Sequence, residues 1–85
     1  MVITWDNAKR LANIFKHGLD FADLDEDFFG NAVIVRACPP RFTAIGGLRD
    51  AMAVVVIFAP LGAEAVSVIP MRPANKKERS LLHAP

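Results

Sequence analysis

The feature that most constrains the fold of this chain is an almost wholly apolar run at residues 52–59 (MAVVVIFA). Turn-forming sequences flank the run at residues 46–50 and 61–63. Continuous hydrophobicity without alternation is typical of a strand that is covered on both faces of a sheet. The wider apolar segment, residues 51–60, is far shorter than the ~20 residues that a membrane-spanning helix needs. We therefore predict a central strand here.

Other short segments of β-branched and apolar residues surround this run. They lie at residues 2–4, 32–36, 41–45 and 64–69. Cys38, Pro39 and Pro40 separate the second of these segments from the third, and glycine-containing turns separate the later ones. Connections this short join antiparallel neighbours, so the strands after residue 31 should form a meander, with the first segment as an edge or terminal strand.

An amphipathic helix is predicted directly after the first strand. Its apolar residues recur at the i, i+3, i+4 and i+7 positions of one helix face: Ala8, Leu11, Ala12 and Phe15. Asp6 or Asn7 can cap the helix, and Gly18 can end it in the left-handed conformation. We expect the apolar face to pack on the core, with Trp5 as a core or staple residue.

A second helix is predicted to begin after Asp20 as its N-cap and to end at Gly30. The residues expected on its buried side are Phe21, Leu24 and Phe28. Acidic residues cluster in its first turns, where the helix dipole stabilises them, namely Asp23, Asp25, Glu26 and Asp27. We interpret this acidic run as a solvated face rather than as a catalytic set of carboxylates.

The stretch at residues 66–79 (VSVIPMRPANKKER) combines an apolar strand, an arginine near its end and a short basic helix. Asn75 lies three residues before Glu78, which is the spacing of a capping box, so the helix should begin near Lys76. Arg72 and the cations of the first turn would then lie near backbone amides that favour an anion. Two interpretations of this charge remain open, a phosphate site and a solvated basic turn.

Taken together, these elements predict an α+β fold, with residues 1–85 forming a single domain. Two N-terminal helices should pack on a mainly antiparallel sheet, and a short basic helix should follow at the C-terminal end. Hydrophobic residues make up 53% of the 85 residues and the mean hydropathy is +0.30. This is high for a small monomer, so we expect an exposed apolar patch and either a protein partner or a homodimer.

The remaining composition bears on cofactors and location. The single cysteine, Cys38, excludes an internal disulfide, and we interpret it as structural because no histidine lies nearby in the sequence. No group of cysteines and histidines has metal-ligand spacing, so the sequence predicts no metal site and no cofactor. The chain does not open with a charged leader and cleavage site, so we expect a cytoplasmic protein that has no membrane association.

Several motifs resemble a known protein family. The segments WDNAKRLANIFKHGLDF and RFTAIG, the apolar strand and MRPANKKER are similar, in order and spacing, to the BrnT family of bacterial type II toxins. The most specific parts are the opening WD..K...N..KHG..F and the closing R.A...ER. The resemblance covers nearly the whole chain and implies a small ribonuclease of the RelE-like fold.

This resemblance implies a concrete function. Such toxins are metal-independent endoribonucleases that cut RNA and arrest growth. They are neutralised by a BrnA-type antitoxin with a ribbon-helix-helix DNA-binding region, and they pair with it through a toxin dimer. The complex of toxin and antitoxin represses its own operon.

Cleaving RNA without a metal requires the ribose 2′-hydroxyl to attack phosphorus, with a base, an acid and cations on the phosphate oxygens. Arg72 and Arg41 are the candidate cations, because both occur at strand ends and at positions that match the family. His17 is the candidate for proton transfer, although it could instead stabilise the helix C-terminus as a cation. The candidate contacts to the RNA backbone are Lys76, Lys77, Arg79, Lys16 and Lys9.

The sequence also departs from the family pattern. Pro40 stands where an acidic residue usually precedes the arginine matched by Arg41, and Pro70 stands where a small or hydroxyl residue is usual. Leu82 lies near the place of a frequent tyrosine. These changes affect acid–base chemistry more than phosphate binding. They favour a second hypothesis, a catalytically weakened interaction protein that binds an antitoxin or regulator without cutting RNA. A simple nucleic-acid-binding module would explain the charge distribution but not the apolar excess.

Overall fold

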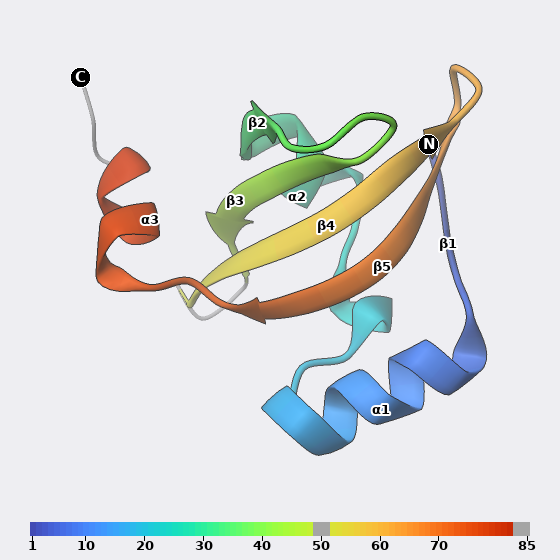
Figure 1. Ribbon diagram of the computed structural model, residues 1–85, viewed down its shortest axis with the longest axis horizontal. Helices are drawn as coiled ribbons and strands as arrows, with labels where there is room; N and C mark the ends of the chain where they lie inside the picture. Colours follow the sequence, from blue (N-terminus) through green and yellow to red (C-terminus); the bar gives the residue numbers. More distant parts are fainter. Residues whose placement is uncertain (49–51, 83–85) are drawn as a thin grey trace.

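The computed structural model describes residues 1–48 and 52–82 of the chain, which form a mixed α+β structure around one five-stranded sheet (Figure 1). The strands are β1 (Val2–Trp5), β2 (Val33–Arg36), β3 (Phe42–Gly47), β4 (Ala53–Leu61) and β5 (Ala65–Pro73). The helical elements are α1 (Asn7–His17), a 3₁₀ turn η1 (Phe21–Asp23), α2 (Glu26–Asn31) and α3 (Lys76–Leu81). No helix among the described residues is long and apolar enough to cross a membrane.

The sheet has the strand order β1-β5-β4-β3-β2, so the apolar strand β4 lies at its centre, as predicted. The strands β2 to β5 are antiparallel neighbours joined in sequence, which confirms the predicted meander. The first strand, β1, pairs in parallel with β5 and forms one edge. Parallel pairing is possible here because a long connection, which includes α1 and the meander, separates β1 from β5 in the sequence.

Alternate residues of β4 are buried on opposite faces of the sheet. Val54 and Val56 lie in the main core, whereas Val55 packs on the other face against Ile45 and Ala74. Both faces of the strand therefore exclude water, which is why its hydrophobic residues do not alternate with polar ones.

The main core lies between the sheet and the segment that connects α1 to β2. In Figure 1 helix α2 lies behind the sheet, and it contacts β3. Trp5 packs against this core and meets the ring of Phe21 edge to face, with 6.3 Å between ring centroids. The buried members of the core are Leu19, Phe21, Leu24, Phe28, Phe29, Ala44, Val54, Val56, Phe58, Val66, Val68 and Met71.

Helix α1 ends as predicted, but its apolar face lies on the wrong side for the predicted packing. Gly18 adopts a left-handed φ of 68°, and its N–H donates to the Ile14 carbonyl at 2.7 Å. Leu11 is 59% exposed and Phe15 is 94% exposed, and Ala8 and Ala12 are exposed as well. The prediction that this face packs on the core is therefore wrong.

The side of α1 that faces β5 is instead anchored by a buried polar residue, Asn13. Its side-chain amide donates to the Leu19 carbonyl at 3.0 Å, and its side-chain oxygen accepts from the Met71 N–H at 3.1 Å. Both partners are backbone groups that need a hydrogen bond when buried. Satisfying them decides which side of α1 meets the sheet.

The second predicted helix is divided into two. Asp20 does act as a cap, accepting from Ala22 N–H at 2.9 Å, but it caps only the short turn η1. Asp25 then starts α2 as a second cap, accepting from Phe28 N–H at 2.8 Å. Aspartate side chains compete with the helix for backbone N–H groups, so a run of acidic residues can begin a helix twice. Gly30 lies inside α2 and does not end it, contrary to the prediction.

The C-terminal helix begins at Lys76, and its predicted capping box is present. The side-chain oxygen of Asn75 accepts from Glu78 N–H at 2.8 Å, and the Glu78 carboxylate accepts from Asn75 N–H at 2.9 Å. By contrast, Cys38 is exposed on the connection between β2 and β3, which does not fit the structural role we assigned to it.

Candidate active site

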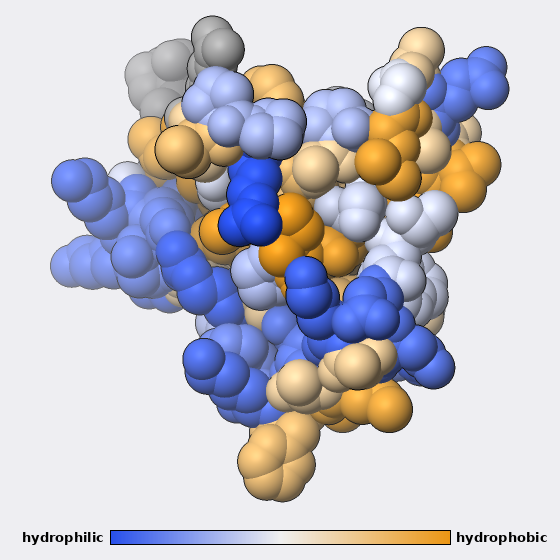
Figure 2. Space-filling model, turned by 45° about the vertical axis from the view of Figure 1, so that its right-hand side comes forward, coloured by the Kyte–Doolittle hydropathy of each residue, from blue (hydrophilic) through white to orange (hydrophobic). Residues whose placement is uncertain are grey.

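A hollow of about 160 Å³ lies where the C-terminal end of α1 meets the outer face of the sheet, which is the face opposite the main core. Three of its lining residues are basic or titratable, Lys16, His17 and Arg72, and its apolar residues are Val55, Ile57 and Pro70. On this side of the molecule, Figure 2 shows hydrophobic residues set among strongly hydrophilic ones. The structure therefore brings together three of the predicted site residues, with Arg72 on β5 at least 55 positions in the sequence from Lys16 and His17 on α1.

The hollow exists because α1 is tied to β5 immediately beside Arg72. Asn13 holds the Met71 N–H, and Lys16 and His17 follow one turn later on the same helix. His17 is the last residue of α1, with Gly18 turning the chain away after it. The imidazole and the Lys16 ammonium are thereby held next to the arginine by a short path of fixed contacts.

A bulge in β5 determines where Arg72 lies along the strand. Val56 pairs with Met71 and Phe58 pairs with Val68, so Ile69 and Pro70 together oppose the single residue Ile57. Proline cannot donate a ladder hydrogen bond and is tolerated at such a bulge. The strand resumes after the bulge, with Met71 buried in the core and Arg72 paired with Val55.

The guanidinium group of Arg72 is already paired with an acid of the same chain. Its Nη1 and Nη2 donate to the two carboxylate oxygens of Glu78, each at 2.7 Å, and Nη1 also donates to the Pro73 carbonyl at 3.2 Å. The Arg72 hydrogen bonds are the largest cause, and the Asn75 N–H a further one, that lowers the pKa of Glu78 to about 2. Glu78 is therefore ionised at neutral pH and fixes the orientation of the arginine.

The pairing with Glu78 leaves part of the Arg72 guanidinium group available for a ligand. A guanidinium group has five N–H donors, and within the described part of the chain the bonds to Glu78 and Pro73 use three of them. The two that remain are the Nε–H and one N–H of Nη2, which lie on the same edge of the guanidinium plane. That edge has the spacing of a bidentate phosphate contact.

The other predicted catalytic residue, Arg41, lies outside the hollow. It is exposed and directly precedes β3, with its own N–H donating to the Cys38 carbonyl at 2.9 Å. Thr43, two positions later, pairs with Ile57 in the floor of the hollow. Arg41 itself precedes the first residue of β3, and it is not among the residues that line the hollow.

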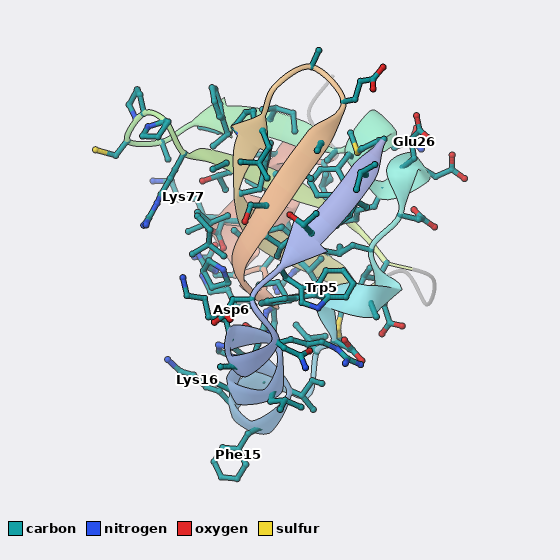
Figure 3. All side chains as sticks on the ribbon, turned by 90° about the vertical axis from the view of Figure 1, so that its right-hand side faces the viewer. Trp5, Asp6, Phe15, Lys16, Glu26 and Lys77 are labelled. Atoms are coloured by element: carbon teal, nitrogen blue, oxygen red, sulfur yellow. The ribbon has the colours of Figure 1, made fainter. Side chains whose placement is uncertain are left out.

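The remaining predicted RNA contacts lie on α1 and α3. Lys9, Lys76, Lys77 and Arg79 are all exposed, and Arg79 also donates to the Ala74 carbonyl at 2.9 Å. Figure 3 shows Lys16 and Lys77 projecting to one side of the sheet and Glu26 to the other. Acidic and basic side chains of these elements thus project to opposite sides of the sheet.

The acidic side has a hollow of its own, about 210 Å³ in volume, lined by Asp23, Asp25 and Asp27 together with Phe28, Asn31, Gly47 and Leu48. Asp25 is engaged there as the cap of α2. Within the part of the chain that the structure describes, no three histidine, cysteine or acidic side chains are grouped as ligands for a metal ion.

Two residues of the site were missed from the sequence. Asn13 was read only as part of a motif on a helix, and Glu78 only as a capping residue. Asn13 gave no local signal, because both of its partners, Leu19 and Met71, lie outside the helix. The signal for Glu78 was its position six residues after Arg72, across the turn that joins strand to helix.

The arrangement supplies the groups that phosphate-ester chemistry needs. Arg72 and Lys16 place positive charge beside an apolar floor, where charge interactions are stronger than in bulk water. His17 supplies an imidazole, the side chain that enzymes use most often for proton transfer. The hollow is open and small, which suits one phosphate and its flanking sugar atoms rather than a whole cofactor.

Comparisons with known proteins identify the family of the chain. The family described as "Ribonuclease toxin, BrnT, of type II toxin-antitoxin system" matches residues 5–78. The structure is similar to the crystal structure of the Brucella abortus ribonuclease toxin, BrnT, with 49% sequence identity and a TM-score of 0.84. That match covers 89% of this chain and 99% of the Brucella chain. No curated protein sequence matches the chain.

Proposed function

Because the chain belongs to the BrnT family of ribonuclease toxins from type II toxin–antitoxin systems, we propose that it is an endoribonuclease whose catalytic centre is the hollow between α1 and β5. The observation that carries this proposal is the convergence of Lys16, His17 and Arg72 on one hollow. The reaction needs no metal ion, since these side chains supply both the cations and a proton-transfer group.

Arg72 is the main phosphate contact in the proposed mechanism. Its Nε–H and free Nη2–H bind two non-bridging oxygens of the scissile phosphate, while Glu78 holds the rest of the guanidinium group. Lys16 adds a second positive charge from the opposite wall of the hollow. As the 2′-hydroxyl attacks, charge grows on these oxygens, and fixed cations stabilise the transition state more than the ground state.

His17 carries the proton transfer. As a neutral imidazole it accepts the proton of the 2′-hydroxyl, and as an imidazolium it can return a proton to the leaving 5′-oxygen. Its backbone position at the end of α1 is fixed by the Gly18 cap and by the anchor at Asn13. The acid and the base need not be the same residue, and Lys16 is the second candidate for the acid.

The RNA backbone follows the basic side of the sheet. Lys77 projects to the same side as Lys16, and Arg41 directly precedes β3, whose Thr43 pairs with Ile57 in the floor of the hollow. We assign backbone contacts to these residues and to Lys9, Lys76 and Arg79, which are exposed cations. Arg41 thereby changes from a catalytic candidate to a residue that binds the strand outside the hollow.

The wider biological context is also part of the proposal. A type II toxin has an antitoxin partner, and we propose a BrnA-like protein with a ribbon-helix-helix region, bound to a toxin homodimer. The meander with flanking helices supports a RelE-like fold, and the single sheet supports one domain over residues 1–85. We expect the protein to act in the cytoplasm, where its RNA substrate lies.

The test is RNA cleavage in the presence of EDTA. Purified wild-type protein and Arg72→Ala are incubated with total RNA and followed on a denaturing gel. We expect Arg72→Ala to reduce cleavage by about 100-fold or more, in line with the loss of one transition-state donor. The matched control is Arg79→Ala, which removes the same charge outside the hollow and should weaken RNA binding without a comparable loss of kcat. Equal cleavage by wild type and Arg72→Ala would overturn the assignment.

One observation favours a second candidate function, an interaction protein with weakened catalysis. Pro70, which stands where a small or hydroxyl residue is usual in the family, lines the hollow itself. The same RNA assay distinguishes the two functions. If the folded wild type, checked by circular dichroism, leaves RNA intact while Pro70→Ser cleaves it, the chain is a toxin that has lost activity at this position.

A further inference from the structure

The exposed apolar face of α1 is unexplained by the proposed catalysis. We define the α1 stripe as Ala8, Leu11, Ala12 and Phe15, all of them exposed. Figure 3 shows Phe15 projecting from the end of the molecule into solvent. A single exposed apolar residue is ordinary, but four on one face of an 11-residue helix form a continuous surface.

Two lysines border this stripe along one side. Lys9 and Lys16 are seven residues apart, which is two helical turns, so they lie above one another on α1. Successive residues of a helix are about 100° apart around its axis, so Lys9 and Lys16 lie between the α1 stripe and the buried side of the helix. They lie beside the edge of the stripe that Ala12 forms, and Leu11 forms the other edge. Lys16 also lines the catalytic hollow, so the stripe and the hollow are adjacent.

We propose that the α1 stripe is the docking surface for the antitoxin, and that it takes an amphipathic helix with acidic residues along one edge. The apolar side chains of that helix would cover Leu11 and Phe15, and its acidic edge would face Lys9 and Lys16. A helix placed there also covers the rim of the hollow at Lys16, so docking and inhibition share one surface. This inference rests on the proposed function as a toxin.

The charges of α1 favour a foreign partner over a second copy of the chain. No acidic residue occurs in α1, so two stripes meeting face to face would bring lysines together without an anion. RNA is also a poorer occupant, because bases stack on aromatic rings and Phe15 is the one aromatic residue of the stripe. Aliphatic neighbours such as Leu11 call for the apolar face of a protein helix.

The test measures binding and inhibition with the purified antitoxin from the toxin's own operon. The toxin variant Leu11→Ala/Phe15→Ala is compared with Val2→Ala/Leu61→Ala, which removes exposed apolar side chains near the β4–β5 hairpin, at the opposite end of the sheet from α1 (Figure 1). Circular dichroism establishes that each variant is folded. Calorimetry gives the affinity for the antitoxin, and the RNA assay gives the concentration that halves cleavage.

We expect the α1 variant to lose affinity at least about tenfold, as for loss of a buried aromatic anchor, and to need correspondingly more antitoxin for inhibition. Its cleavage without antitoxin and the binding of the control variant should be unchanged. Wild-type affinity in the α1 variant would overturn the proposal. The proposal would also be overturned if sedimentation showed a changed oligomeric state for the α1 variant while its antitoxin binding stayed unchanged, because the stripe would then belong to a dimer. A loss that affects RNA binding alone would overturn it as well. Calorimetry does not depend on cleavage, so failure of the ribonuclease proposal would be seen separately.

Discussion

At the scale of single residues, the site depends on two polar side chains that do no chemistry themselves. Asn13 ties α1 to the strand residue before Arg72, and Glu78 holds the Arg72 guanidinium group. Asn13 accepts from a buried backbone N–H, that of Met71, and Glu78 pairs with a charged side chain, that of Arg72. Their effect on the site is to limit how far Lys16, His17 and Arg72 can move relative to one another.

Replacing Asn13 with alanine should destabilise the fold. The change leaves the buried Met71 N–H and the Leu19 carbonyl without their side-chain partner, which we expect to cost about 2 kcal/mol of unfolding free energy. Urea denaturation measures this loss. The control is Asn31→Ala, because Asn31 is exposed and donates only to the Asp27 carbonyl, and its change should stay within about 0.5 kcal/mol. Equal effects at the two positions would contradict the role given to Asn13.

The unfolding free energy should fall in acid, because the carboxylates of two ion pairs become protonated. Hydrogen bonds from Arg72 lower the pKa of Glu78 from 4.5 to about 2, and those from Arg10 lower the pKa of Asp20 from 3.8 to about 2. A carboxyl group with a lowered pKa stabilises the folded state above its unfolded pKa, and this contribution is lost as pH falls toward the folded pKa. The unfolding free energy should therefore decrease between about pH 4.5 and pH 2.

The variant Glu78→Gln isolates one of these contributions. It cannot ionise at position 78, so its unfolding free energy should be lower than that of the wild type at pH 6 and should decline less between pH 5 and pH 3. Denaturant titrations at each pH give both slopes. Parallel curves for the two proteins would show that the Arg72–Glu78 pair does not contribute to the acid response.

At the scale of elements, the termini of the helices decide where the side chains of the site are placed. Gly18 ends α1 directly after His17, with a left-handed φ that side chains other than glycine adopt at a cost. The capping box starts α3 at the point that brings Glu78 opposite Arg72. The bulge at Ile69 and Pro70 similarly sets the position of Arg72 along β5.

Glycine-to-alanine substitutions test the C-terminal end of α1. Gly18→Ala should lose about 1 kcal/mol of stability from backbone strain alone, because no atom lies within 4 Å of the added methyl group. Gly30→Ala has equally open surroundings but lies inside α2 without a positive φ, so it should gain about 0.5–1 kcal/mol. Thermal or urea unfolding measures both changes. A gain at position 18 would show that the left-handed cap is dispensable.

At the scale of the whole molecule, charge is separated by the sheet. Lys16 and Lys77 project to the side with the hollow, and Glu26 projects to the side of α2 (Figure 3). This separation leaves one face suited to a polyanion and gives the other a repulsive field. A net charge of only +1 conceals this separation.

RNA binding should therefore depend on salt through the basic face alone. Lys77→Ala should reduce the slope of log affinity against log salt concentration by about 0.7, the value for one contact to a single-stranded phosphate. Glu26→Gln, on the opposite side of the sheet, should leave the slope unchanged. Fluorescence anisotropy with a labelled RNA oligonucleotide measures both. An equal change in the two variants would contradict the assignment of the RNA path to one face.

Local chemistry in the sequence was enough to predict most elements of the fold. The apolar run of β4 indicated a central strand, the short connections indicated a meander, and the spacing of Asn75 and Glu78 indicated the start of α3. These predictions succeeded because turns, caps and β-branched runs act over a few residues. The family was likewise evident from the motifs at the two ends of the chain. Those motifs contain Arg72, His17 and Lys16, which the structure places around one hollow.

The tertiary structure decided what the local patterns could not. The apolar stripe of α1 looked like a core face, but the hydrogen bonds of Asn13, formed with residues as far as 58 positions away, turn that stripe to solvent. The carboxylate of Glu78 looked like a helix cap, but the end of β5 also brings Arg72 onto it. Periodicity shows that a helix has an apolar side, yet only contacts between distant segments determine whether that side meets the core or remains available to a partner.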